Sequence, residues 1–258
     1  MKRIIILYHS GVCNTKMVAE KALNELSPHF NTDIFSVEAL PACLDFNQYD
    51  GMIIGFPTIH ASPSPRMEAF MKGLERLEKP LPALLFSTCG FYSANALRIF
   101  AKMCILKNII PVQSQSFRCA ATDGTLLFPQ WNFLFTHEKK LDEKVAKACS
   151  SFINTFKFNA IKARIPRFKL YSILNYPNKF MGKHLKFRIY LHKNKCIKCG
   201  QCIKNCPAGA LVQDQENYPG FTKEKCENCY RCIHHCPKLA LSLSKKKSPL
   251  RVLDDRTI

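Results

Sequence analysis

The sequence lacks any run of apolar residues long enough to cross a membrane, for which about eighteen are needed. It also lacks a secretory signal, because the apolar stretch after Lys2 and Arg3 is too short and no small-residue cleavage site follows it. We therefore expect a soluble, cytoplasmic protein without a transmembrane segment. Contact with a membrane surface stays open.

Several catalytic patterns are missing as well. There is no Rossmann G-x-G-x-x-G, so oxidation of NAD(P)H at a dedicated dinucleotide domain is not expected. No P-loop, Ser-His-Asp set or pair of catalytic carboxylates stands out either. We assign no catalytic side chain, and the chemistry has to come from cofactors.

Acidic residues are scarce in one part of the chain. Residues 1–155 hold 16 Lys and Arg against 13 Asp and Glu, whereas residues 156–258 hold 22 against 6. Residues 156–195 contain eleven basic residues, no acid and several aromatic residues. This stretch fits a linker, a docking surface for an acidic redox protein, or a surface for anionic lipid or nucleic acid. The sequence contains no nucleic-acid-binding motif, so nucleic acid is not expected as a partner.

Cysteine, in contrast, is abundant, with fourteen in the chain. Eight of them form two copies of C-x2-C-x2-C-x3-C-P, at 196–207 and 226–237. Bacterial ferredoxins use this run to hold [4Fe–4S] clusters, and the fourth cysteine of each run ligates the other cluster. Structural zinc is the main alternative, although it prefers two separated pairs of ligands. We predict two [4Fe–4S] clusters, one bound by Cys196, Cys199, Cys202 and Cys236, the other by Cys226, Cys229, Cys232 and Cys206.

The first 156 residues alternate between apolar runs and amphipathic stretches. Strands are expected at 3–8, 32–37, 49–57, 82–88 and 109–117, with helices between them. The second helix is expected to include Leu74 and Leu77, and a last helix is expected at 138–156. This alternation predicts an α/β doubly wound parallel sheet of five strands. Ligands bind such sheets at the carboxyl ends of the strands. The loops 9–15, 57–63 and 89–95 should therefore meet in one crevice.

The first of these loops resembles the flavodoxin phosphate loop, [S/T]-x-T-G-N-T, in the run Ser10-Gly11-Val12-Cys13-Asn14-Thr15. Val12 replaces the usual threonine and Cys13 the usual glycine. With the cysteine motifs behind it, the whole chain is similar to the flavodoxin–ferredoxin fusions of anaerobic prokaryotes. The resemblance implies a flavodoxin-like fold and an FMN site in which Phe91, Tyr92 or His60 stacks on the flavin. It assigns cofactor binding to Ser10, Gly11, Val12, Cys13, Asn14, Thr15, Pro57, Thr58, Ile59, His60, Cys89, Gly90, Phe91 and Tyr92.

Four regions follow from these patterns: a flavodoxin-like domain at 1–156, a basic aromatic linker at 157–192, a small α+β 2[4Fe–4S] ferredoxin-like domain at 193–245 and a basic tail at 246–258. Each ferredoxin repeat should form a cluster loop, a short helix after the Cys-Pro pair and a strand. A core of this size depends on its metals for folding.

The expected function is electron transfer between two clusters and one FMN, which couples one-electron and two-electron redox partners. The main alternative is an FMN-dependent reductase whose own clusters supply electrons for a small-molecule acceptor. A third reading is a binding module with a vestigial flavin site, which the departures at Val12 and Cys13 allow.

Overall fold

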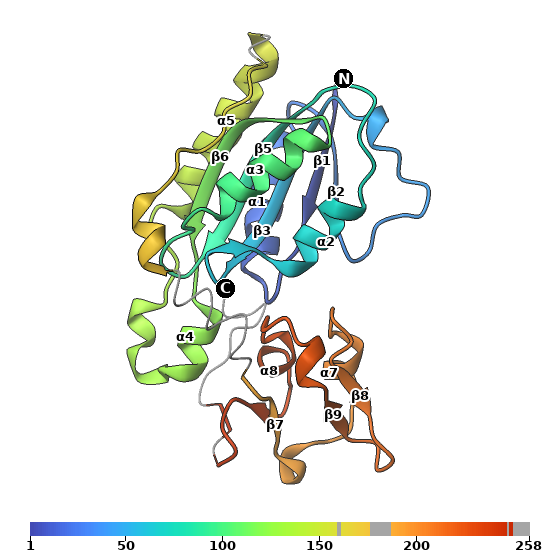
Figure 1. Ribbon diagram of the computed structural model, residues 1–258, viewed down its shortest axis with the longest axis vertical. Coiled ribbons are helices and arrows are strands. Elements are labelled where there is room, and N and C mark those ends of the chain that lie inside the picture. Colours follow the sequence, from blue (N-terminus) through green and yellow to red (C-terminus); the bar gives the residue numbers. More distant parts are fainter. Residues whose placement is uncertain (159–160, 176–186, 247, 250–258) are drawn as a thin grey trace. The chain divides into compact units, whose positions relative to one another are not determined.

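The computed structural model describes residues 1–158, 161–175, 187–246 and 248–249 (Figure 1). Within these residues the chain forms two compact units. The first comprises 1–10, 14–119 and 137–175, and the second comprises 11–13, 120–136 and 187–249. In the described part of the chain, no helix is both long and apolar enough to cross a membrane.

The first unit is built on a parallel sheet with the strand order β2-β1-β3-β5-β6. This is the predicted five-stranded, doubly wound sheet, and its order is that of the flavodoxin-like fold. The strands are β1 (Arg3–Tyr8), β2 (Asn31–Ser36), β3 (Gly51–Ile59), β5 (Leu81–Cys89) and β6 (Ile109–Arg118).

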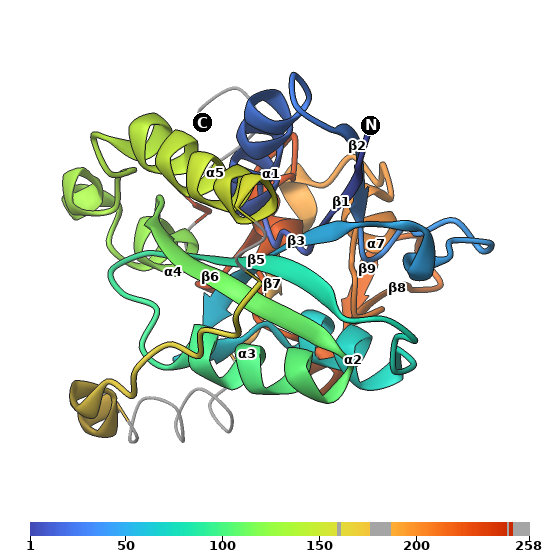
Figure 2. The same cartoon turned by 90° about the horizontal axis from the view of Figure 1, so that it is seen from above.

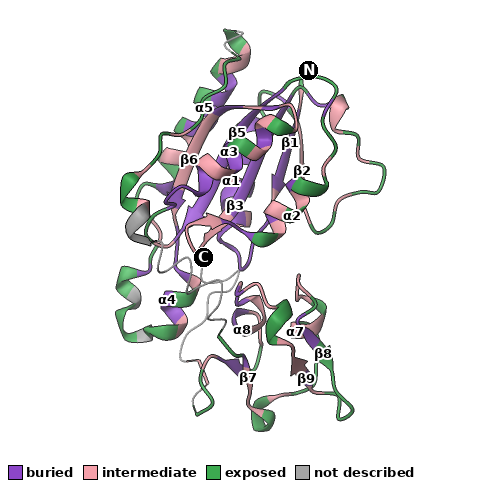
Figure 3. Ribbon diagram, in the orientation of Figure 1, coloured by how far each residue is buried: buried purple, intermediate pink, exposed green. Residues whose placement is uncertain are grey.

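Alternate side chains of the central strands enter two separate cores, one on each face of the sheet. Helices cover both faces of the sheet (Figure 2), and its central strands are largely buried (Figure 3). Ile4 and Ile6 pack with helices α1 (Asn14–Leu26) and α5 (Leu141–Lys157). Ile5 and Leu7 pack with helices α2 (Pro65–Gly73) and α3 (Ala96–Leu106). Burial on both faces explains why the strands read as continuous apolar runs.

The third strand continues past its expected end and folds back on itself. Ile59 pairs with Ser62 of the short antiparallel strand β4 (Ser62–Pro63). His60 and Ala61 link the two strands with φ angles of 47° and 62°. Positive φ at both central residues defines a type I′ turn, where a simple loop was expected.

The second helix is shorter than predicted, because α2 ends at Gly73. Leu74 and Leu77 nevertheless pack against the same core, from extended chain beyond the helix. Between β6 and α5, in the second unit, lie helix α4 (Thr122–Leu127) and a 3₁₀ turn (Pro129–Leu134), which the sequence did not indicate.

The second unit contains two copies of one structural repeat, thirty residues apart. Each has a 3₁₀ turn, a four-residue helix and a strand: Lys193–Lys195, α7 (Gln201–Lys204) and β8 (Leu211–Gln213), then Lys223–Lys225, α8 (Arg231–His234) and β10 (Leu241–Ser242). β8 pairs with β9 (Pro219–Phe221) and β10 pairs with β7 (Tyr190–Leu191), both antiparallel. The short helix precedes the Cys-Pro pair in both copies, so the prediction that it follows this pair was wrong.

The expected linker 157–192 is described only in part. Residues 161–175, with a 3₁₀ turn at Leu170–Asn175, group with the first unit, and residues 187–192 group with the second. Residues 176–186 of the linker, and residues 247 and 250–258 of the expected tail, lie outside the described residues. The bounds of the four regions stay predictions.

Candidate metal centres and flavin site

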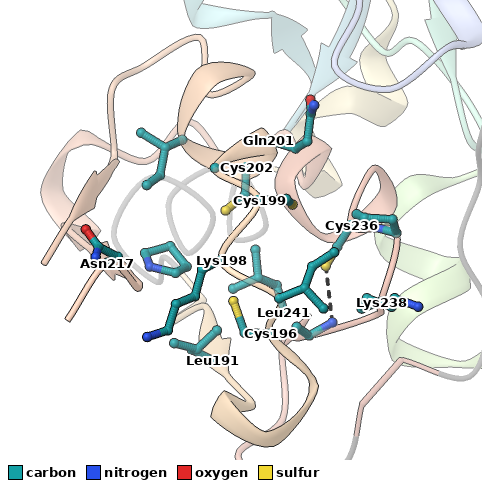
Figure 4. A pocket seen from close by; sticks show the side chains of 16 residues that line it. Leu191, Cys196, Lys198, Cys199, Gln201, Cys202, Asn217, Cys236, Lys238 and Leu241 are labelled. Atoms are coloured by element: carbon teal, nitrogen blue, oxygen red, sulfur yellow. Dashed lines mark hydrogen bonds between the residues drawn. The ribbon is translucent and has the colours of Figure 1, made fainter.

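The first candidate metal centre is a cavity in the second unit. Its lining includes Cys196, Cys199 and Cys202 from the first motif, and Cys236 from the end of the second. In Figure 4 the sulfur atoms of these four residues point toward a common space. Apolar side chains complete the wall, among them Leu191, Ile197, Ile203 and Leu241.

A second cavity in the same unit has the complementary set of cysteines. Cys226, Cys229 and Cys232 from the second motif line it together with Cys206 from the first. The fourth cysteine of each motif therefore lies at the cavity of the other motif. The structure brings together the same two groups of four cysteines that the sequence predicts, and their role as ligands is taken up below.

Backbone N–H groups donate to the sulfur atoms of three of these eight cysteines. The Ala210 N–H donates to Cys206 Sγ and the Ala240 N–H donates to Cys236 Sγ, each at 3.2 Å. The Asn228 N–H donates to Cys226 Sγ at 3.4 Å. Such bonds stabilise negative charge on sulfur and tune the potential of a bound cluster.

Tight loops bring these groups into place, and their left-handed residues recur with the thirty-residue repeat. Lys198 and Asn228 have φ angles of 58° and 55°, and Gly200 and Tyr230 have 70° and 56°. Gly209 and Leu239 form a third pair, at 58° and 50°. Both repeats thus fold their cysteine loops in the same way, although the second copy has side chains where the first has glycine.

The thiols are costly to ionise in these surroundings without a metal. Burial, and after it the neighbouring Cys236 and Cys196, raise the pKa of Cys202 to about 11. Burial likewise raises the pKa of Cys229 to about 12. Iron–sulfur ligands are thiolates, so their charge requires compensation by the iron. Four cysteines, apolar walls and N–H donors at sulfur fit a cubane cluster in each cavity.

Within the described ranges, no three His, Cys, Asp or Glu side chains are grouped so that they could hold one metal ion.

The candidate flavin site lies at the carboxyl edge of the parallel sheet in the first unit. β1, β3 and β5 are consecutive neighbours in the sheet, so Ser10, the end of β3 and the end of β5 meet at this edge. Pro57, Thr58 and Ile59 belong to the end of β3, and His60 is in the turn that follows. Cys89 ends β5, and Gly90, Phe91 and Tyr92 precede α3.

Two polar groups at this edge bear on whether a ligand fits. Thr15, at the start of α1, shares a buried hydrogen bond of 2.8 Å with the hydroxyl of Thr88 at the end of β5. Thr58 Oγ1 is buried and has no hydrogen-bond partner among the residues that the structure describes. A buried hydroxyl without a partner is costly unless a ligand or water satisfies it. The edge therefore fits a polar ligand such as FMN.

The aromatic residues expected at the flavin differ in their surroundings. Phe91 is 59% exposed and Tyr92 is 45% exposed. The Tyr92 ring contacts the Tyr171 ring edge to face, with 5.7 Å between the ring centroids. The Cys89 thiol donates to the Phe117 carbonyl oxygen, at 3.7 Å. Burial raises the pKa of this thiol to about 11.

The middle of the expected phosphate loop is assigned differently from its ends. Ser10, Asn14 and Thr15 belong to the first unit and are buried, whereas Gly11, Val12 and Cys13 group with the second unit. Val12 and Cys13 form a small buried cluster there with Ala120. The structure thus brings Ser10, Asn14 and Thr15 to one edge with the predicted flavin residues at the ends of β3 and β5.

Sequence reasoning missed the residues that support the loop before α3. Asn95 contacts Lys169 and Ser172, which are more than seventy positions away in the chain. No local pattern signals a contact of this kind, because the partners are so far apart in the sequence.

Comparison with known proteins gives two family matches. A model described as a flavodoxin domain matches residues 5–113, and one described as a 4Fe-4S dicluster domain matches residues 195–247. No curated protein sequence matches the chain.

Solved structures with a similar fold include a flavodoxin from the domain Archaea, with 15% identity over 60% of this chain and 99% of that chain and a TM-score of 0.44. Flavodoxin 2 from Bacillus cereus has 20% identity over 61% of this chain and 99% of that chain, with a TM-score of 0.45. A flavoprotein from Lactobacillus acidophilus, solved with FMN, has 16% identity over 45% of this chain and 93% of that chain, with a TM-score of 0.37.

Proposed function

The chain joins a flavodoxin domain to a 4Fe-4S dicluster domain, which makes it a flavodoxin–ferredoxin fusion, and we propose that it couples one-electron and two-electron redox partners. An electron-transfer role with FMN and iron–sulfur chemistry follows from the two domains. The proposal adds that one chain holds two [4Fe–4S] clusters and one FMN. When bound, FMN exchanges one or two electrons and each cluster exchanges one.

The observation that carries the proposal is the pair of cavities with four cysteines each. One full ligand set per cavity supports two clusters rather than one. In the first cavity the ligands are Cys196, Cys199, Cys202 and Cys236; in the second they are Cys206, Cys226, Cys229 and Cys232. The chain's own contribution is to order these thiolates, to donate N–H groups to their sulfur atoms and to limit water with apolar walls.

For the flavin, the residues at the sheet edge supply binding and orientation. Asn14 and Thr15 open α1, where backbone N–H groups and the helix dipole favour a phosphate. Thr58 offers a buried hydroxyl, and Phe91 offers an exposed aromatic face. Together these groups suit a ligand with an anionic end and an aromatic end, as FMN has.

The test is anaerobic purification followed by iron, sulfide and flavin analysis, with an EPR-monitored redox titration. We expect about eight irons and one flavin per chain. Colourless protein, or zinc in place of iron, would contradict the proposed clusters. Intact clusters without any flavin would favour the binding-module reading.

The strongly basic C-terminal part supports an acidic redox protein as the partner. Residues 156–258 carry 22 Lys and Arg against 6 Asp and Glu, a net charge of +16 before any cofactor is counted. Complementary charge accelerates encounter and is screened by salt. Electron transfer to an acidic ferredoxin-type acceptor should slow severalfold between low and physiological ionic strength. A rate independent of salt would refute electrostatic docking.

One observation favours the reductase alternative. Phe91 is largely exposed at the proposed flavin edge, so a small molecule could stack there. Anaerobic steady-state assays separate the two functions. Saturable reduction of small oxidants would support the reductase, whereas electron transfer to redox proteins alone would exclude it.

A further inference from the structure

A stretch of chain beyond the flavodoxin match crosses the first unit. It runs from Arg164 to Ser172 and, in Figure 1, follows β6 as a gold trace. The Arg164 N–H donates to the carbonyl oxygen of Pro111, a residue of β6, at 2.6 Å. The Arg98 guanidinium, on α3, donates to the Pro166 carbonyl oxygen at 2.8 Å. We call residues 164–172 the crossing segment.

The crossing segment is joined to the loop before α3 through Asn95. The Asn95 Oδ1 accepts from the Lys169 N–H at 2.9 Å, and its Nδ2 donates to the Lys169 carbonyl oxygen at 3.4 Å. Nδ2 also donates to Ser172 Oγ. This one amide therefore pairs with both backbone groups of Lys169, as a neighbouring strand would.

The position of Asn95 makes this use of its side chain informative. Asn95 is the N-cap residue of α3, where an asparagine side chain normally accepts from the first helical N–H groups. Here the side chain makes no such bond and contacts the crossing segment instead. The helix gives up a favourable cap, and the loop gains an attachment to distant chain.

Two more contacts join the same loop and segment. The Lys169 ammonium donates to Ser93 Oγ at 3.3 Å, and the rings of Tyr92 and Tyr171 meet edge to face. Tyr92, Ser93 and Asn95 are thus all held by residues 169–172. The positive charge of Lys169 is held at the loop that follows β5.

We propose that residues 169–172 of the crossing segment are part of the flavin site. The inference rests on the proposed function, which puts FMN at the carboxyl ends of β1, β3 and β5. The Asn95–Lys169 pair keeps residues 90–95 in the conformation that accepts the flavin, so Asn95 and Ser172 are positioning residues. Lys169 adds a positive charge that favours the reduced, more negative flavin over the oxidised one.

The experiment uses the full-length, cluster-loaded chain after removal of FMN. FMN is titrated back and its fluorescence quenching gives Kd, while a redox titration gives the flavin potentials. The variants are Asn95→Ala, Ser172→Ala and Lys169→Gln. Arg167→Gln is the matched control, because it removes a positive charge from an exposed position of the same segment.

Asn95→Ala should weaken FMN binding about tenfold, since it removes hydrogen bonds that order the loop. Ser172→Ala should weaken binding less, in the same direction. Lys169→Gln should change the affinity for oxidised FMN little and lower the affinity for reduced FMN about tenfold. This difference lowers the reduction potential of a one-electron couple by about 59 mV. Arg167→Gln should leave both the Kd and the potentials unchanged.

Hydrogen exchange gives a readout that does not depend on the variants folding. In the wild-type chain, FMN should slow exchange of the Lys169 amide together with residues 90–95. A wild-type chain that binds FMN with no added protection of Lys169, and variants with unchanged Kd and potentials, would overturn this inference alone. A wild-type chain that does not bind FMN would overturn the proposed function as well.

Discussion

The crossed arrangement of the cysteines makes a stoichiometric prediction. Cys206 lines the cavity of the second motif, and Cys236 lines that of the first. Removal of one ligand should therefore cost the cluster of the cavity that the cysteine lines, and not that of its own motif. Alanine is the replacement of choice, because serine can itself ligate iron.

Pairs of substitutions make this prediction quantitative. With about four irons in each cavity, Cys206→Ala or Cys226→Ala alone should lower the iron content from about eight to about four per chain. The double variant Cys206→Ala/Cys226→Ala should also keep about four, because both residues line one cavity. Cys206→Ala/Cys196→Ala should lose nearly all iron, because it damages both cavities.

The assay is iron and sulfide analysis of anaerobically purified protein, with EPR spin quantification after reduction. Cys43→Ala is the control, since this exposed thiol lies outside both cavities and the iron content should not change. The reverse pattern, with iron lost in Cys206→Ala/Cys226→Ala and retained in Cys206→Ala/Cys196→Ala, would refute the crossing. Equal loss in all variants would mean that the two cavities do not fill independently.

Three further predictions concern the sheet and the repeats. Ala61→Gly should raise the free energy of unfolding by about 1 kcal/mol, because residue 61 has a φ of 62°. Ala69→Gly, in the exposed part of α2, should lower the free energy of unfolding by about 1 kcal/mol. Urea titrations of the two variants measure both effects. Thr88→Val removes the hydroxyl partner of buried Thr15 and should destabilise the first unit by about 1–3 kcal/mol and weaken FMN binding, while Thr88→Ser should retain both properties; a loss in the serine variant would argue against the hydrogen bond as the cause. Removal of iron by a chelator should make residues 193–245 sensitive to protease while the sheet stays protected, because cluster binding supplies much of the folding energy of so small a core; mass mapping of the fragments would detect the opposite result.

Much of the architecture is encoded in short-range patterns. Buried parallel strands read as apolar runs, so β1 and β5 were predicted nearly to the residue. The cysteine spacing was enough to predict which four residues share a cavity, because the crossing belongs to the motif itself. These signals are local, or they repeat at a fixed interval.

Predictions failed where tertiary packing replaced the local signal. Leu74 and Leu77 continue a helical period but pack on the core from extended chain, because α2 ends at Gly73. The turn between β3 and β4 contains no glycine, so His60 and Ala61 gave no hairpin signal. The role of Asn95 was hidden because its partners lie over seventy residues away.

The crossing of the two motifs also bears on how the protein is made. Under the proposed assignment the first cavity requires Cys236, the fourth cysteine of the second motif, although its other three ligands are synthesised at least thirty residues earlier. A nascent chain that ends before that residue offers one cavity with four thiols and another with three. Biosynthesis therefore leaves the first iron centre unfinished until position 236 has been translated, and a premature stop just before that position would deprive the earlier motif of its cluster.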